Sequence, residues 1–188
     1  MQTWPLLSLL IWVPAIGGAL VLATGNSRPA QARWIALASA LLVLALCVPL
    51  YNGLDTGNAS MQFVERHAWF PAINTWYSLG VDGISVALIA LTAFVTVLTL
   101  VGAWEVIEDR VHQYFASFLF LEALMIGVFC ARDALLFYVF FEAMLVPMFI
   151  IIGVWGGPRR VYATIKFFLY TFFGSIFMLV GLAYLYMQ

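Results

Sequence analysis

The chain has 188 residues, of which 65% are hydrophobic and only 9% are charged. A soluble globular domain carries about 25% charged residues, because its surface must face water. This composition excludes a soluble domain, a disordered segment and a disulfide scaffold, and a net charge of −1 does not suit a nucleic-acid-binding protein. The sequence therefore predicts a protein that folds in a lipid bilayer.

Six apolar segments are long enough to cross a bilayer, which takes about 20 helical residues. The polar stretch 52–81 is the only long connection between them, and its aromatic residues predict an ordered external loop with room for a short hairpin. The predicted fold class is an all-α polytopic membrane protein, with one membrane domain over residues 1–188. Its helices are expected at about 5–24, 33–51, 82–103, 113–131, 134–155 and 165–187.

The basic residues predict how these helices are oriented, because cytoplasmic loops are enriched in lysine and arginine. Two of the eight basic residues, Arg66 and Arg132, fall on one side of the predicted topology. The other six are expected to face the cytoplasm, which places the N-terminus in the periplasm if the membrane is the bacterial inner membrane, as we expect. These six are Arg28, Arg33, Arg110, Arg159, Arg160 and Lys166.

Two acidic residues lie where acids are costly. Seven of the nine acidic residues fall in loops or at helix ends, but Glu122 and Glu142 lie inside apolar runs. An ionised acid at the bilayer centre costs about 2.5–3.5 kcal/mol on insertion scales. Such a residue is expected to carry protons, or else to stay protonated and to hydrogen-bond a neighbouring helix.

The predicted depths of the two acids are nearly equal. Arg132 and Asp133 mark the turn between the fourth and fifth helices, ten residues after Glu122 and nine before Glu142. With a rise of 1.5 Å per residue, each acid lies roughly 13–15 Å from that turn. The rotation of the helices is not readable from the sequence, so whether the two side chains face each other stays open.

Glu142 has no obvious partner in the sequence. Pro147 has no N–H, so the carbonyl of Ala143 loses its usual hydrogen-bond partner. Either this carbonyl holds a water or a protonated carboxyl, or the proline simply bends the helix. Lys166 is expected at the start of the sixth helix, on the cytoplasmic side and far from the level of Glu142, where it can extend to the headgroups. Glu142 is therefore either protonated or paired with a cation outside these 188 residues.

Three motifs carry a resemblance to a known family. The sequence resembles the antiporter-like, proton-pumping subunits of respiratory complex I, and among them the subunit M family, whose mitochondrial counterpart is NADH dehydrogenase subunit 4. The similarity runs along the whole chain. The motifs are LGVDGISVALIALT (79–92), FYVFFEAMLVPMFIIIGVWG (137–156) and RRVYATIKFFLYTFFGS (159–175).

The resemblance implies that this chain is the N-terminal part of a subunit with about fourteen helices. It also implies that Glu142 is a proton relay, whose lysine partner lies on a seventh helix outside this chain. Lys166 matches the lysine that the family carries at the start of helix six, and Glu122 is a candidate second relay.

The implied activity is proton translocation driven by electron transfer from NADH to quinone, as a membrane subunit of a translocase with no redox site of its own. NADH, FMN, iron–sulfur clusters and quinone would be bound by other subunits, and this chain would bind no cofactor or metal. The implied partners are neighbouring membrane subunits and lipid, without nucleic acid.

Two alternatives remain open from the sequence. The chain is either a subunit of a multisubunit cation/proton antiporter or membrane-bound hydrogenase of the same superfamily, or a non-catalytic membrane scaffold whose acids only fix the helix register.

Overall fold

The computed structural model describes residues 4–55, 57–58, 60–70 and 75–187. This part of the chain holds six helices, all long and apolar enough to span a bilayer, which confirms the predicted polytopic membrane fold. A two-stranded hairpin lies within the long connection. The elements are α1 (Leu6–Ala23), α2 (Pro29–Asn52), β1 (Gln62–Phe70), β2 (Thr75–Val81), α3 (Gly83–Gly102), α4 (Val111–Cys130), α5 (Ala134–Trp155) and α6 (Arg160–Met187).

Two helices begin earlier than their apolar segments predict. The helix α2 starts at Pro29 and α6 starts at Arg160, four and five residues before the predicted starts at 33 and 165. Hydropathy marks the part of a helix that contacts lipid, whereas the helix itself can continue into the polar interface. Proline is well suited to the first turn of α2, because its missing N–H has no partner there anyway.

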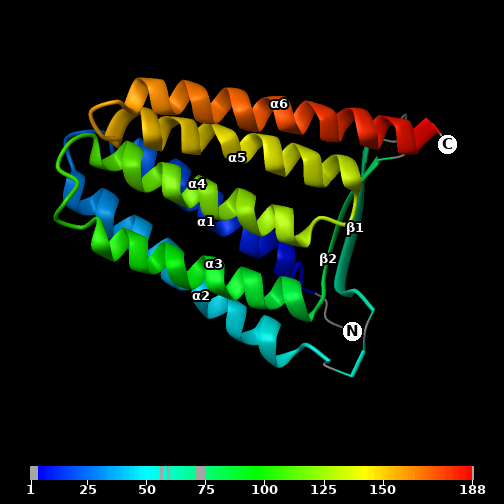
Figure 1. Cartoon of the computed structure of the whole chain (residues 1–188). Coiled ribbons are helices and arrows are strands. Elements are labelled where there is room, and N and C mark those ends of the chain that lie inside the picture. Colours follow the sequence, from blue (N-terminus) through cyan, green and yellow to red (C-terminus); the bar gives the residue numbers. More distant parts are fainter. Residues whose placement is uncertain (1–3, 56, 59, 71–74, 188) are drawn as a thin grey trace.

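The helix α4 lies at the centre of the bundle (Figure 1). It packs against α1, α2 and α3 on one side and against α5 on the other, and α6 packs on α5. Half of the span of α4 is buried, compared with 6% of the span of α6. The buried apolar side chains form two clusters, one at each end of the four-helix group α1–α4.

The hairpin crosses one end of the bundle, which we call the hairpin end (Figure 1). Its two strands are antiparallel, with Glu65 opposite Leu79 and His67 opposite Tyr77. We call the opposite end the arginine end, because five of the basic residues lie in or next to its loops. They are Arg28, Arg33, Arg110, Arg159 and Arg160.

The turn between α4 and α5 is fastened to the hairpin. The backbone N–H of Arg132 donates to the carbonyl of Ser78, at 2.9 Å. The Asp133 carboxylate caps α5 by accepting from the N–H of Leu135 at 2.9 Å, and it also accepts from the N–H of Trp76 in β2 at 3.2 Å. One carboxylate thus satisfies backbone donors from both elements and fixes where α5 begins.

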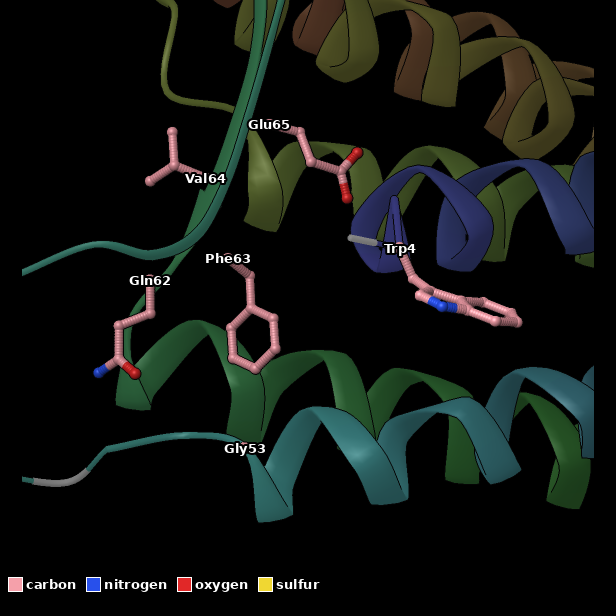
Figure 2. A pocket seen from close by; sticks show the side chains of 6 residues that line it. All are labelled: Trp4, Gly53, Gln62, Phe63, Val64 and Glu65. Carbon is pink, nitrogen blue, oxygen red and sulfur yellow. The ribbon is translucent and has the colours of Figure 1, made fainter. Parts of the chain in front are cut away.

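A carboxylate of the hairpin caps α1. Pro5, at the start of α1, offers no side-chain cap. Glu65 of β1 points toward this helix end (Figure 2) and accepts from the N–H of Leu7 at 2.8 Å and of Ser8 at 3.2 Å. The hydroxyl of Ser8 also donates to Glu65. The strand therefore supplies the negative charge that a helix N-terminus favours, and this ties α1 to the hairpin.

Replacing Glu65 with alanine should release the first turn of α1. Hydrogen bonds to a charged group contribute about 1.5–3 kcal/mol, so Glu65→Ala should speed amide exchange at Leu7 and Ser8 by tenfold or more. Glu65→Gln retains one carbonyl acceptor and should have an intermediate effect. Hydrogen–deuterium exchange on the assembled membrane protein measures this, with Glu108→Ala, an exposed acid at the arginine end, as the control. Equal protection in the Glu65→Ala and Glu108→Ala variants would contradict this capping role.

The start of α3 depends on a local cap. The Asp82 side chain accepts from the N–H of Ser85 at 2.7 Å. This hydrogen bond holds the pKa of Asp82 below its ordinary value. A lowered pKa in the folded state means that the cap is complete above the ordinary pKa of aspartate and is lost as the pH falls through the lowered value.

Substitutions at Asp82 should distinguish the hydrogen bond of the cap from the negative charge of the carboxylate. Asp82→Ala should weaken the start of α3 by about 1 kcal/mol, whereas Asp82→Asn, also a good cap, should keep it. Exchange of the Ser85 amide in the unsubstituted protein should increase in acid relative to the asparagine variant at the same pH. An identical pH response in the two proteins would show that the carboxylate is not the cap.

Candidate functional site

Glu122 lies in the middle of α4 and is buried inside the bundle. Its side chain is 1% exposed, and neither carboxyl oxygen has a hydrogen-bond partner among the described residues. It lines a cavity together with Thr92 and Thr96 of α3, and it lies within electrostatic range of Cys47 of α2. Glu122 thus faces the α2–α3 side of α4.

Glu142 lies on α5 and faces a different neighbour. It is partly buried, and its Oε1 atom has no hydrogen-bond partner in the described structure. Tyr138, one turn earlier on α5, interacts with both Glu142 and Ser175 of α6. Ser175 is buried against α5. The carboxyl of Glu142 is therefore on the α6 side of α5.

The structure places the two acids at matching depth but does not bring them together. Glu122 is eight residues from the end of α4 and Glu142 is eight residues from the start of α5, so each lies about 12 Å from the hairpin end of its helix. They do not hydrogen-bond each other, because both oxygens of Glu122 are without a partner in the described residues. The helix rotation, which the sequence left open, therefore places the two carboxyls on opposite sides of the α4–α5 pair, so they do not face each other.

A glycine of α4, nearer the hairpin end than the two acids, allows α4 and α5 to approach closely. A Cβ atom built on Gly127 would lie 2.7 Å from the ring of Phe140 on α5, so this ring occupies the space that a side chain would need. Because this contact sets the rotation of α5 against α4, it also sets the direction in which Glu142 points.

Alanine at this glycine should separate the two helices. Gly127→Ala should destabilise the protein by about 1–3 kcal/mol, the usual cost of overpacking a tight interior. Gly174→Ala on α6 is the matched control, because a Cβ atom there meets nothing within 4 Å. Thermal unfolding in detergent compares them, and equal midpoints for the two variants would show that the Gly127–Phe140 contact is not a tight one.

Lys166 is exposed and lies on a face of α6 that Glu142 does not reach. Its Nζ atom is 3.4 Å from the Tyr162 hydroxyl and 5.5 and 5.6 Å from the ring centroids of Tyr162 and Tyr170, both on α6 itself. The residues of α6 that are buried against the bundle, Thr164 and Ser175, lie on another face. The structure therefore does not place Lys166 beside Glu142.

The proline of α5 borders an open cavity that starts near the arginine end. This cavity has a volume of about 620 Å³ and includes Ala143 and Pro147 of α5 together with Gln113 and Ser117 of α4. Ala143 is the residue next to Glu142, and its carbonyl lacks the N–H that Pro147 cannot supply. The cavity thus leads from the end of the bundle to the backbone beside the acid.

Thr92 and Thr96, which line the cavity with Glu122, are the residues that the sequence did not lead us to expect at the site. They recur with Thr99 at positions i, i+4 and i+7 of α3, which is the spacing of one helix face. That pattern of hydroxyls in an apolar span was the available signal.

Among the described residues no group of three or more histidine, cysteine, aspartate or glutamate side chains could hold a metal ion.

Fold and site define a polytopic membrane protein that carries two separate carboxyls in the middle of its spans. Residues 32–131 match the family model described as NADH-ubiquinone oxidoreductase chain 4, amino terminus. Residues 131–188 match the model described as NADH:quinone oxidoreductase/Mrp antiporter, TM. The chain belongs to the NADH-ubiquinone oxidoreductase chain 4 family, which confirms the resemblance to subunit M.

Named relatives agree with this assignment. The chain is 49% identical over 187 residues to NADH-quinone oxidoreductase subunit M of Rhodobacter capsulatus. This alignment covers 97% of this chain and 36% of the relative. It is 42% identical over 183 residues to NADH-ubiquinone oxidoreductase chain 4 of Arabidopsis thaliana, with coverage of 97% and 37%. The chain therefore spans little more than a third of the length of these relatives.

Solved structures share the fold. A chain of respiratory complex I from Thermus thermophilus with bound NADH matches with a TM-score of 0.77 and 30% identity, over 93% of this chain and 34% of that one. A chain of the Mrp complex from Dietzia sp. DQ12-45-1b matches with a TM-score of 0.79 and 17% identity, over 94% of this chain and 19% of that one. The second likeness concerns the fold alone.

Proposed function

We propose that this chain forms the first six spans of a proton-translocating membrane subunit of an NADH–quinone oxidoreductase. Family membership supports the assignment to this complex. The observation that carries the proton role is Glu142, a mid-span carboxyl whose Oε1 atom has no hydrogen-bond partner among the described residues. NADH, FMN, iron–sulfur clusters and quinone would be bound by other subunits, so this chain moves protons but transfers no electrons. Its partners would be neighbouring membrane subunits.

The location that fits this role is the bacterial inner membrane. The arginine end would face the cytoplasm, because basic loops are retained on that side. The start of α1, at the hairpin end, would then face the periplasm. The hairpin would form an ordered cap on the periplasmic surface, and its exposed Arg66, stacked 4.2 Å from the ring centroid of Trp76, would lie at the headgroup level.

Glu142 would carry a proton by alternating between two states. In a low-dielectric span, a carboxyl without a cation favours its neutral, protonated form, and an approaching cation favours the ionised form. That cation would come from the remainder of the subunit, because Lys166 does not reach the carboxyl in the described structure. Proton loading and release would follow the approach and withdrawal of this charge.

The cavity beside Pro147 would give the proton access from the arginine end. Its polar side chains, Gln113 and Ser117, lie on α4 near that end, and Ala143 lies at its inner limit. Water in this cavity could hydrogen-bond the free carbonyl of Ala143 and so approach Glu142. Lys166, exposed on α6, would contact the remainder of the subunit.

Replacing the carboxyl of Glu142 tests this proposal. In the full-length subunit within its assembled complex, Glu142→Gln should abolish NADH-driven proton pumping, because the amide fills the same space but cannot release a proton. Pumping is measured with a pH-sensitive dye in inverted membrane vesicles, normalised to the amount of assembled complex. Glu108→Gln, an exposed acid at the arginine end, is the control. Full pumping by an assembled Glu142→Gln complex would refute the proposal.

A cation/proton antiporter subunit is the second candidate, favoured by the family model that names both classes for residues 131–188. Purification of the intact complex separates the candidates: flavin and iron–sulfur subunits support the oxidoreductase, whereas their absence together with sodium-driven pH changes supports the antiporter. If Glu122→Ala and Glu142→Ala disrupted assembly but left proton translocation unchanged, the chain would be a scaffold.

A further inference from the structure

The cavity in front of Glu122 lies between α3 and α4, away from the face that carries Glu142. It has a volume of about 270 Å³ and is lined by Leu91, Thr92, Val95 and Thr96 of α3 and by Glu122 of α4. Leu91 is 56% exposed and Val95 is 46% exposed, so the cavity opens at the outer surface of the bundle. Figure 1 shows α3 and α4 side by side along their length.

The depth of the polar groups matches across this cavity. Thr92 is nine residues from the start of α3 and Glu122 is eight residues from the end of α4, so both lie about 12–14 Å from the hairpin end. Thr96 lies one turn further toward the arginine end. The carboxyl therefore meets the hydroxyl-bearing face of α3 at mid-span, where unsatisfied polar groups are most costly.

The hydroxyls around Glu122 are arranged to accept hydrogen bonds. Thr92 donates its hydroxyl hydrogen to the carbonyl of Leu88 at 2.8 Å, and Thr96 donates to the carbonyl of Thr92 at 2.9 Å. With their hydrogens already committed, these hydroxyls offer only oxygen lone pairs to the cavity. A protonated carboxyl can donate to such a lone pair, whereas an ionised carboxyl finds no donor there.

The other helices packed on α4 add little charge near Glu122. Cys47 of α2 is the titratable group that interacts with it. The helix α1 meets α4 through Gly17 and Gly18, and α5 meets it through Phe140, none of which carries a charge. The surroundings thus contain no basic group, in the described residues, that would stabilise the carboxylate.

We propose that Glu122 is a second proton-binding site, which opens to the α3–α4 surface and holds its proton independently of Glu142. This second site goes beyond the proposed function, because it needs neither the α5–α6 face nor a cation from the remainder of the subunit. Its ligand is the proton itself, held as a neutral carboxyl in a cavity where the threonine hydroxyls of α3 have no hydrogen left to donate to a carboxylate. The carboxyl oxygens without partners and the cavity that they line carry this inference.

A lipid-soluble carbodiimide probes such a site directly. A protonated carboxyl adds across one C=N bond of dicyclohexylcarbodiimide: its proton goes to a nitrogen and its oxygen bonds to the central carbon, giving an O-acylisourea. The acyl group then migrates from oxygen to nitrogen, giving a stable N-acylurea. All atoms are retained, nothing is oxidised, and the ionised carboxylate does not start the reaction.

The experiment labels the assembled complex in membranes and locates the adduct by peptide mass spectrometry. The adduct should appear on Glu122, persist in Glu142→Gln and decrease as the pH rises. Leu91→Trp, which fills the mouth of the cavity, should reduce labelling of Glu122 several-fold while leaving other labelled carboxyls unchanged. Exchanging choline chloride for sodium chloride should have no effect.

Three results would overturn the proposal. If Glu122 carries no adduct while other membrane carboxyls are labelled, the site is closed or ionised. Protection by sodium would assign the cavity to a metal cation instead of the proton. Loss of the Glu122 adduct in an assembled Glu142→Gln complex would show that the two acids form one coupled site. The labelling does not depend on pumping, so failure of the proposed function at Glu142 is detected separately.

Discussion

The cost of a carboxyl group in hydrocarbon is the constraint on which the rest of the structure depends. A charge at mid-span has no water to stabilise it, so each such acid must be enclosed by protein and kept neutral or paired. Glu122 meets this constraint by full burial at a cavity that Thr92 and Thr96 also line, and Glu142 by a position between α5 and α6. Among the described residues, both carboxyl oxygens of Glu122 and one of Glu142 have no hydrogen-bond partner, so neither acid is held by a fixed donor at every oxygen.

The hairpin end fixes the framework in which these acids lie. The carboxylates of Glu65 and Asp133 bind backbone donors of α1, α5 and β2, so polar groups at the bundle end set the positions of the spans. Within the membrane, the Gly127–Phe140 contact sets the rotation of α5 against α4. Hydrogen-bonding caps therefore act at the hairpin end, while close packing of side chains against backbone acts within the membrane, where the low dielectric makes unpaired polar groups costly.

The sequence predicted the elements of this fold well, because apolar runs of bilayer length are a strong local signal. It also predicted the equal depth of Glu122 and Glu142, since the helix rise and a short turn determine it. The side chains that each acid faces could not be predicted, because rotation depends on packing between Gly127 and Phe140. The cap by Glu65 was equally hidden, since it joins residues 58 positions apart. Thr92 and Thr96 follow a readable helical spacing, but their meaning depends on which face α4 presents to them.

Infrared difference spectroscopy of the assembled complex, comparing acidic and alkaline pH, tests the central claim that the two acids bind protons separately. The account predicts two carboxylic C=O stretching bands, one removed by Glu122→Gln and the other by Glu142→Gln, with each band unchanged when the other residue is substituted. A single band that disappears in either variant would contradict it, because the acids would then share one proton.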